Sequence, residues 1–163
     1  MRKTIIGVMG PGKEADKVDI QNAYQLGQLI AEQGWVVLSG GRNTGVMDAV
    51  NRGAKSKGGL TLGILPSDEK GLISEGVDLA VITNMRSGRN YLNVLSSDVV
   101  IACGINPGTA SEIALGLTAE KPVVLLQPTK ETRTFFESIG KKLLYIAQNP
   151  EEAILLAKKS LII

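Results

Sequence analysis

A glycine-rich turn, Ser39-Gly40-Gly41-Arg42-Asn43-Thr44-Gly45, carries the residue types that point most directly to chemistry. It follows the apolar run Trp35–Leu38 and precedes Val46–Val50, so it is predicted to join a buried strand to a helix. Such a turn directs free backbone N–H groups and the positive end of a helix dipole at one point, and glycines let an anion approach closely. The turn therefore predicts a phosphate site, with a tight turn that binds nothing as the alternative.

A second glycine-rich turn, Gly7-Val8-Met9-Gly10-Pro11-Gly12, follows the first apolar run. Its glycines are spaced G-x-x-G-x-G rather than in the dinucleotide pattern G-x-G-x-x-G. No acidic residue ends the second strand to hold a ribose, because Ser39-Gly40-Gly41 stands there. A nicotinamide-dependent dehydrogenase is therefore disfavoured, and Gly10 and Gly12 are candidates for contact with a phosphate.

A third turn, Gly104-Ile105-Asn106-Pro107-Gly108-Thr109-Ala110-Ser111-Glu112, follows the apolar run around Cys103. Gly108 and Thr109 are expected to offer N–H groups at a helix start. Glu112 is expected in the first turn of that helix, where the dipole favours an ionised carboxylate. The pattern Thr109-x-x-Glu112 also matches a capping box, which would give the acid a structural role instead.

Two arginines, Arg86 and Arg89, are spaced to share one face of a predicted helix. A basic face beside glycine-rich helix starts suits a phosphate and a buried acid. The alternative is a solvated basic face with no ligand.

The composition of the 163 residues narrows the chemistry. No histidine and one cysteine exclude a Ser-His-Asp or Cys-His nucleophile and a zinc site of His and Cys, so proton transfer would fall to Glu, Asp, Lys or Tyr. A net charge of +2 without a Lys/Arg block indicates neither a nucleic-acid nor a membrane surface. Cys103 is expected to be a core thiol, and a single cysteine fits a reducing, cytoplasmic setting.

The elements that position these turns alternate between short apolar runs and helical stretches. Continuous Val/Ile/Leu runs are typical of parallel strands covered on both faces. We expect one domain over residues 1–163, a Rossmann-like, doubly wound α/β fold whose mainly parallel sheet has about seven strands and helices on both faces. Strands are predicted at 3–9, 35–38, 60–65, 79–82, 99–103, 123–126 and 143–147, helices at 15–33, 44–57, 86–96, 108–119, 132–141 and from 149, and a mobile loop at 67–76.

These segments resemble a known family. The chain is similar to the lonely guy family, also called lysine decarboxylase-like, whose best-known members are cytokinin-activating phosphoribohydrolases. Within it, the chain looks most like the short bacterial nucleotide-binding proteins related to molybdenum cofactor carrier proteins. The resemblance is carried by Gly7-Val8, Gly10, Ser39-Gly40-Gly41, Gly45–Val50, Gly53-Ala54, Gly58-Gly59, Gly63–Pro66, Arg89-Asn90, Asp98 and Gly108–Ile113.

The family's hydrolases carry the motif Pro-Gly-Gly-x-Gly-Thr-x-x-Glu and an upstream arginine. This chain keeps the second half of the motif and Arg89, but Gly104-Ile105-Asn106-Pro107 replaces the first half and Asn90 stands where the hydrolases have lysine. The resemblance therefore implies binding of a phosphorylated small molecule, either a nucleoside monophosphate or a pterin such as molybdenum cofactor. Hydrolysis of a nucleoside monophosphate to free base and ribose 5-phosphate is the alternative, and a purely structural oligomer is a third.

The resemblance also implies roles for single residues. In a hydrolase, Glu112 would steer water and stabilise an oxocarbenium-like ribose, while Arg89 would fix charge. No resident cofactor or metal is expected, and a homodimer or homotetramer is expected to form through the helices at 86–96 and 108–119. The predicted ligand contacts beside this catalytic pair are Gly10, Gly12, Ser39, Gly40, Gly41, Gly45, Arg86, Gly108 and Thr109.

Overall fold

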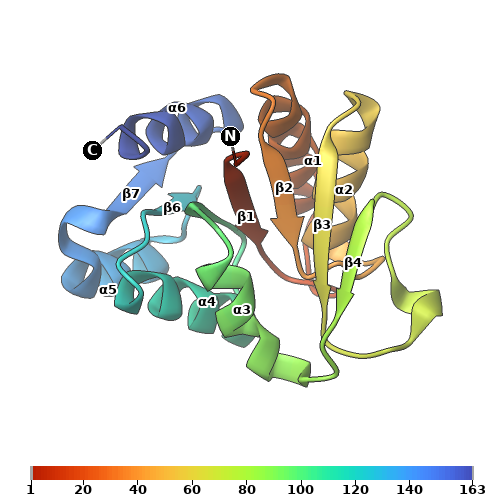
Figure 1. Ribbon diagram of the computed structural model, residues 1–163. Coiled ribbons are helices and arrows are strands. Elements are labelled where there is room, and N and C mark those ends of the chain that lie inside the picture. The colour runs from red at the N-terminus through yellow and green to blue at the C-terminus, as the bar shows by residue number, and fades with distance from the viewer. Residues whose placement is uncertain (1, 163) are drawn as a thin grey trace.

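The structure is a computed structural model that describes residues 2–162 (Figure 1). Within these residues, all pairs of adjacent strands in the seven-stranded sheet are parallel, which confirms the predicted Rossmann-like, doubly wound fold. The strands are β1 (Ile5–Met9), β2 (Val36–Ser39), β3 (Leu60–Leu65), β4 (Leu79–Ile82), β5 (Val99–Cys103), β6 (Val123–Leu126) and β7 (Leu144–Ala147). The α-helices are α1 (Lys17–Glu32), α2 (Gly45–Ser56), α3 (Arg89–Leu95), α4 (Pro107–Thr118), α5 (Lys130–Gly140) and α6 (Pro150–Ser160).

The strand order is β4-β3-β2-β1-β5-β6-β7. The chain builds outward from β1 to β4, then returns beside β1 as β5 and builds outward on the other side. The order therefore reverses between β1 and β5, where Ile6 is paired with Val99. In sheets of this kind, ligands bind at the carboxyl ends of the strands near the reversal, which is where the three predicted turns lie.

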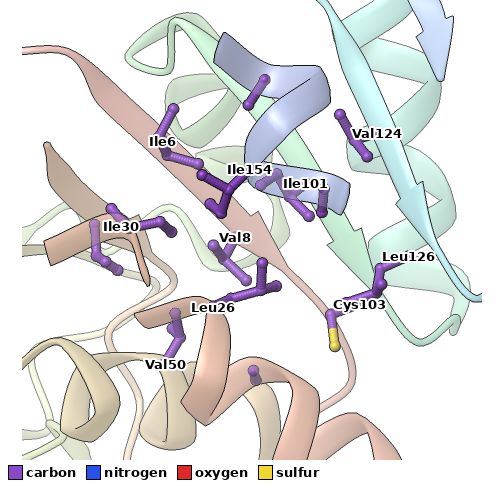
Figure 2. Packing of buried hydrophobic residues seen from close by; sticks show 14 of the residues in the cluster. Ile6, Val8, Leu26, Ile30, Val50, Ile101, Cys103, Val124, Leu126 and Ile154 are labelled. Carbon is purple, nitrogen blue, oxygen red and sulfur yellow. The ribbon is translucent and has the colours of Figure 1, made fainter. Parts of the chain in front are cut away.

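Two hydrophobic layers hold the sheet. Helices α1, α2 and α6 cover one face, and α3, α4 and α5 cover the other (Figure 1). Neighbouring residues of one strand serve opposite layers, so Val8 packs in the first and Met9 in the second. Figure 2 shows the first layer, where Leu26, Val50 and Ile154 approach the strands from three helices.

Several predicted local features are confirmed. Asn149 caps α6 by accepting a hydrogen bond from Glu152 N at 2.8 Å, with Pro150 in the first turn. Gly34 follows α1 with φ +71°, as a helix stop requires. Cys103 is buried, and burial raises the pKa of its thiol. Among the described residues, no helix combines the length and apolar character needed to cross a bilayer.

Two segments differ from expectation. The helix predicted at 86–96 is a 3-10 turn, Arg86–Gly88, followed by α3, and Arg86 has φ +49°. Arg86 is consequently exposed while Arg89 is buried, so the prediction that they share one helix face is wrong. The segment predicted as a mobile loop carries a 3-10 turn and is tied to the β2–α2 turn, because Ser74 N donates to Gly41 O at 2.9 Å.

Helices α1 and α2 touch through their backbones. A Cβ at Gly27 of α1 would overlap the carbonyl oxygen of Val50, and a Cβ at Gly53 of α2 would overlap the backbone of Tyr24. The two glycines therefore allow the close approach of the two helices.

Gly27→Ala tests this contact. Helix propensity alone would stabilise the variant by about 1 kcal/mol. Because the new methyl group meets backbone, we expect overpacking to prevail and the free energy of unfolding to fall by about 1–3 kcal/mol. Urea unfolding followed by circular dichroism measures it. Gly71→Ala is the control, since its Cβ meets no atom within 4 Å. A Gly27→Ala protein more stable than the wild type would contradict the backbone contact.

Candidate ligand-binding site

A cleft of about 640 Å³ opens at the carboxyl edge of the sheet, on the β2–β3 side of the reversal. It is lined by the turns that follow β1, β2, β3 and β5 and by the chain between β4 and α3. The cleft brings together eight of the predicted site residues, namely Gly10, Gly12, Gly40, Arg86, Arg89, Gly108, Thr109 and Glu112.

Ser39, Gly41 and Gly45 lie outside the lining of the cleft. Ser39 Oγ donates to Asn51 Oδ1 at 3.1 Å and accepts from Gly41 N at 3.0 Å. Gly41 and Gly45 have φ values of +74° and +55°, and a Cβ at Gly45 would overlap the carbonyl oxygen of Pro11. These residues shape the β2–α2 turn, and contact between them and a ligand stays a prediction.

Arg89, the first residue of α3, is a buried cation with 9% of its surface exposed. Its Nε has no hydrogen-bond partner among the described residues. The guanidinium lies against Gly40, where a Cβ would come 2.7 Å from Nη2 and 2.6 Å from Met47 Sδ. Gly40 does not have a positive φ, so its missing side chain leaves space beside this guanidinium rather than serving a special backbone conformation.

Glu112 of α4 is the buried acid of the cleft, with 7% of its surface exposed. Its Oε1 accepts a hydrogen bond from Asn93 Nδ2 at 2.8 Å. Within residues 2–162, no nitrogen of Arg89 comes within 4.0 Å of a carboxylate oxygen, so Glu112 and Arg89 interact without forming an ion pair. Burial raises the pKa of Glu112, although Asn93 and the charge of Arg89 oppose it. Burial likewise lowers the pKa of Arg89.

The start of α4 differs from expectation. The helix begins at Pro107, and its N-cap is Asn106, whose Oδ1 accepts from Thr109 N at 2.8 Å. The capping box of Thr109 and Glu112 is therefore wrong, and the N–H of Thr109 is already occupied. Glu112 lies in the second turn rather than the first, and burial raises the pKa of its carboxyl group, which opposes the expected preference for the ionised form.

Comparison with known proteins decides the family. Residues 3–154 match the sequence profile of the SLOG cluster4 family. The chain belongs to the SLOG cluster4 family. Its predicted similarity to lonely guy-like proteins, in the branch related to molybdenum cofactor carriers, is confirmed.

Three proteins that are similar to this chain indicate its relation to proteins of known role. The structure of the molybdenum cofactor binding protein from Rippkaea orientalis has a TM-score of 0.95 and 53% identity over 98% of each chain. A Moco carrier protein from Chlamydomonas reinhardtii has a TM-score of 0.94 and 45% identity over 99% of each chain. The cytokinin riboside 5'-monophosphate phosphoribohydrolase of Mycobacterium tuberculosis is 29% identical over 118 residues, which are 67% of this chain and 63% of the enzyme.

Three residues of this SLOG cluster4 site were missed by sequence reasoning. Arg42 lines the cleft, and its signal was its place inside the glycine-rich turn itself. Asn93 holds the buried acid, and it lies four residues after Arg89, on the same helix face. Asn106 is followed by proline, which is the same capping pattern that correctly predicted Asn149.

Glu112→Gln tests the buried acid through the pH dependence of stability. The folded state holds the proton of Glu112 more tightly than the unfolded chain, whose carboxyl has the ordinary pKa of 4.5. The resulting stabilisation is present below pH 4.5 and is lost as the pH rises through the folded pKa. We therefore expect the variant to gain stability relative to the wild type above pH 4.5, by about 1.4 kcal/mol per unit of pKa rise.

Urea unfolding from pH 4 to 9 measures the difference. Glutamine keeps an amide oxygen for Asn93, so the comparison isolates ionisation. Glu75→Gln changes an exposed carboxyl group and serves as the control. A stability difference that does not change with pH would refute a raised pKa for Glu112.

Proposed function

We propose that the cleft binds a phosphorylated small molecule, either a nucleoside monophosphate or a phosphorylated pterin such as molybdenum cofactor. The observation that carries the proposal is the buried guanidinium of Arg89, which has no ion-pair partner in the described part of the chain. A charge this deeply buried is costly unless an anion and hydrogen bonds compensate it. A phosphate supplies both at once.

The size and chemistry of the cleft support a ligand of this class. Its volume of about 640 Å³ suits a nucleotide or a pterin. Among residues 2–162, no group of three or more His, Cys, Asp or Glu side chains could hold a metal ion. We therefore expect a molybdenum-bearing pterin to be held through its phosphate and its heterocycle. The relative from Rippkaea orientalis, whose structure is that of a molybdenum cofactor binding protein, supports the pterin.

Hydrolysis of a nucleoside monophosphate is the second candidate. It is favoured by the meeting of Arg89 and Glu112 in one cleft and by the similarity to the mycobacterial phosphoribohydrolase. Two observations place it second. Glu112 is held by Asn93 and has a raised pKa, so it is a poorly prepared base for water. The turn before Gly108 contains Ile105 and Asn106 where the hydrolases have glycines.

Ligand-induced stabilisation and product release separate the two candidates. We expect a nucleoside monophosphate such as AMP to raise the unfolding free energy by about 2.7 kcal/mol at 100 times its dissociation constant, with no ribose 5-phosphate released. Arg89→Ala should lose most of this stabilisation, because it removes a charge-assisted contact. Glu112→Gln should keep it. Arg133→Ala, on the exposed surface of α5, is the control.

Thermal unfolding and a ribose 5-phosphate assay provide the measurements. Release of ribose 5-phosphate by the wild type but not by Glu112→Gln would establish the hydrolase instead. If no nucleotide stabilises the protein, the molybdenum and pterin contents are measured in protein purified from a cofactor-producing host. Bound pterin would support the pterin as the ligand, and its absence would argue against a phosphorylated ligand.

We also propose a homodimer or homotetramer that forms through α3 and α4. On α3, Tyr91 and Leu95 are 45% and 44% exposed, whereas Val94 is fully buried under the sheet. The neighbouring edge strand β4 is exposed along its whole length, including Leu79 and Val81. Apolar side chains gathered on one side of a protein mark a surface for association.

Sedimentation velocity at micromolar concentration tests the assembly. We expect a particle of two or four times 17.3 kDa, and Leu95→Glu should shift it toward the monomer because a charge would be buried at the interface. Leu155→Glu changes an equally exposed leucine on α6 and should have no effect. A wild-type particle of 17.3 kDa would rule out the oligomer.

A further inference from the structure

A second guanidinium, that of Arg42, lines the same cleft as Arg89. Arg42 is half-buried, and its Nε, like that of Arg89, is buried without a hydrogen-bond partner among the described residues. The guanidinium of Arg89 lies against Gly40, two residues before Arg42. Burial lowers the pKa of Arg89, the charge of Glu112 raises it and the charge of Arg42 lowers it, so the two cations repel one another. Two like charges are therefore held together at this end of the cleft.

The backbone on either side fixes Arg42 in place. Arg42 forms an isolated antiparallel bridge with Ile73. Asn43 N donates to Leu72 O at 2.9 Å, and Ser74 N donates to Gly41 O at the same distance. The β2–α2 turn and the 67–76 segment thus clamp this residue, and its position does not depend on a ligand.

The acids of the cleft do not neutralise the two arginines. Glu112 Oε1 accepts a hydrogen bond from Asn93 Nδ2, and burial favours the uncharged form of this carboxyl group. Asp68 and Glu69 also line the cleft but are exposed, as is Arg86. In the part of the chain that the structure describes, none of these acids forms an ion pair with Arg42 or Arg89. Two cations thus face one buried acid, so the inner end of the cleft keeps a net positive charge.

The start of α4, the other anion site expected from the sequence, offers fewer free hydrogen-bond donors. Thr109 N already donates to Asn106 Oδ1, and Pro107 has no N–H. Of the first three helical residues, this leaves the N–H of Gly108. A single N–H and a helix dipole are weak compared with two guanidiniums that each present a planar fork of donors.

We propose that Arg42 and Arg89 together form the seat for a dianion, the phosphate monoester end of the ligand. The missing side chain of Gly40 leaves room for the Arg89 guanidinium beside the turn that carries Arg42. The phosphate then lies on the β2–α2 turn rather than at the start of α4. This inference rests on the proposed function and names the group that the cleft recognises.

Titrations of the full chain with small phosphates at pH 8 test the seat. Methyl phosphate is a dianion at this pH and dimethyl phosphate is a monoanion. We expect the wild type to bind methyl phosphate at least tenfold more tightly. Arg42→Gln should weaken methyl phosphate binding at least tenfold. Arg42→Lys should have an affinity between those of the wild type and Arg42→Gln, because lysine keeps the charge but loses the planar fork of N–H donors. Arg133→Gln, an exposed arginine on α5, should bind as the wild type does.

Asn106→Asp separates the two anion positions. Aspartate caps a helix as well as asparagine does, but its charge would repel an anion at the start of α4. We expect it to weaken methyl phosphate binding less than threefold. The seat is overturned if Arg42→Gln, folded as judged by its melting temperature, binds as the wild type does, or if Asn106→Asp loses more affinity than Arg42→Gln. In both cases the proposed function survives. A wild type that binds neither methyl phosphate nor AMP, and that carries no molybdenum or pterin when purified from a cofactor-producing host, refutes both.

Discussion

The burial of one positive charge, that of Arg89, is the constraint on which the rest of the site depends. Removing a guanidinium from water is costly, so the protein must surround it with groups that offset the loss. Gly40 leaves space for the guanidinium. The charge of Glu112 raises the pKa of Arg89 without forming an ion pair, and the charge of Arg42 lowers it. Gly40 and Arg42 come from the β2–α2 turn and Glu112 comes from α4, and all three line the same cleft. This arrangement is the physical basis of the proposed anion site.

The parallel sheet makes such a gathering possible. Because β1 lies in the middle and the chain reverses at β5, the turns after β1, β2, β3 and β5 all reach the same edge. The helices α3 and α4 bring Asn93 against Glu112 from the face opposite α1 and α2. The acid is thereby buried by helix packing, and its raised pKa follows from the fold rather than from its place in a motif.

Sequence reasoning reached the fold because its signals are local and repeated. Continuous apolar runs such as Val99–Cys103 identify strands buried on both faces, and Asn149-Pro150 identifies a helix start. The site was predicted less completely. Periodicity placed Arg86 and Arg89 on one helix face, but it carries no sign of the positive φ at Arg86. The raised pKa of Glu112 depends on contacts made across the fold, which no single segment encodes.

The backbone contact between α1 and α2 has a consequence for how the cleft receives a ligand. Gly27 and Gly53 fix the spacing of two helices whose preceding turns, Gly10–Gly12 and Gly40–Arg42, are walls of the cleft. Main-chain atoms in contact have little freedom to move apart or slide. These walls are thus built before any ligand arrives, and little conformational entropy remains to be lost when one binds.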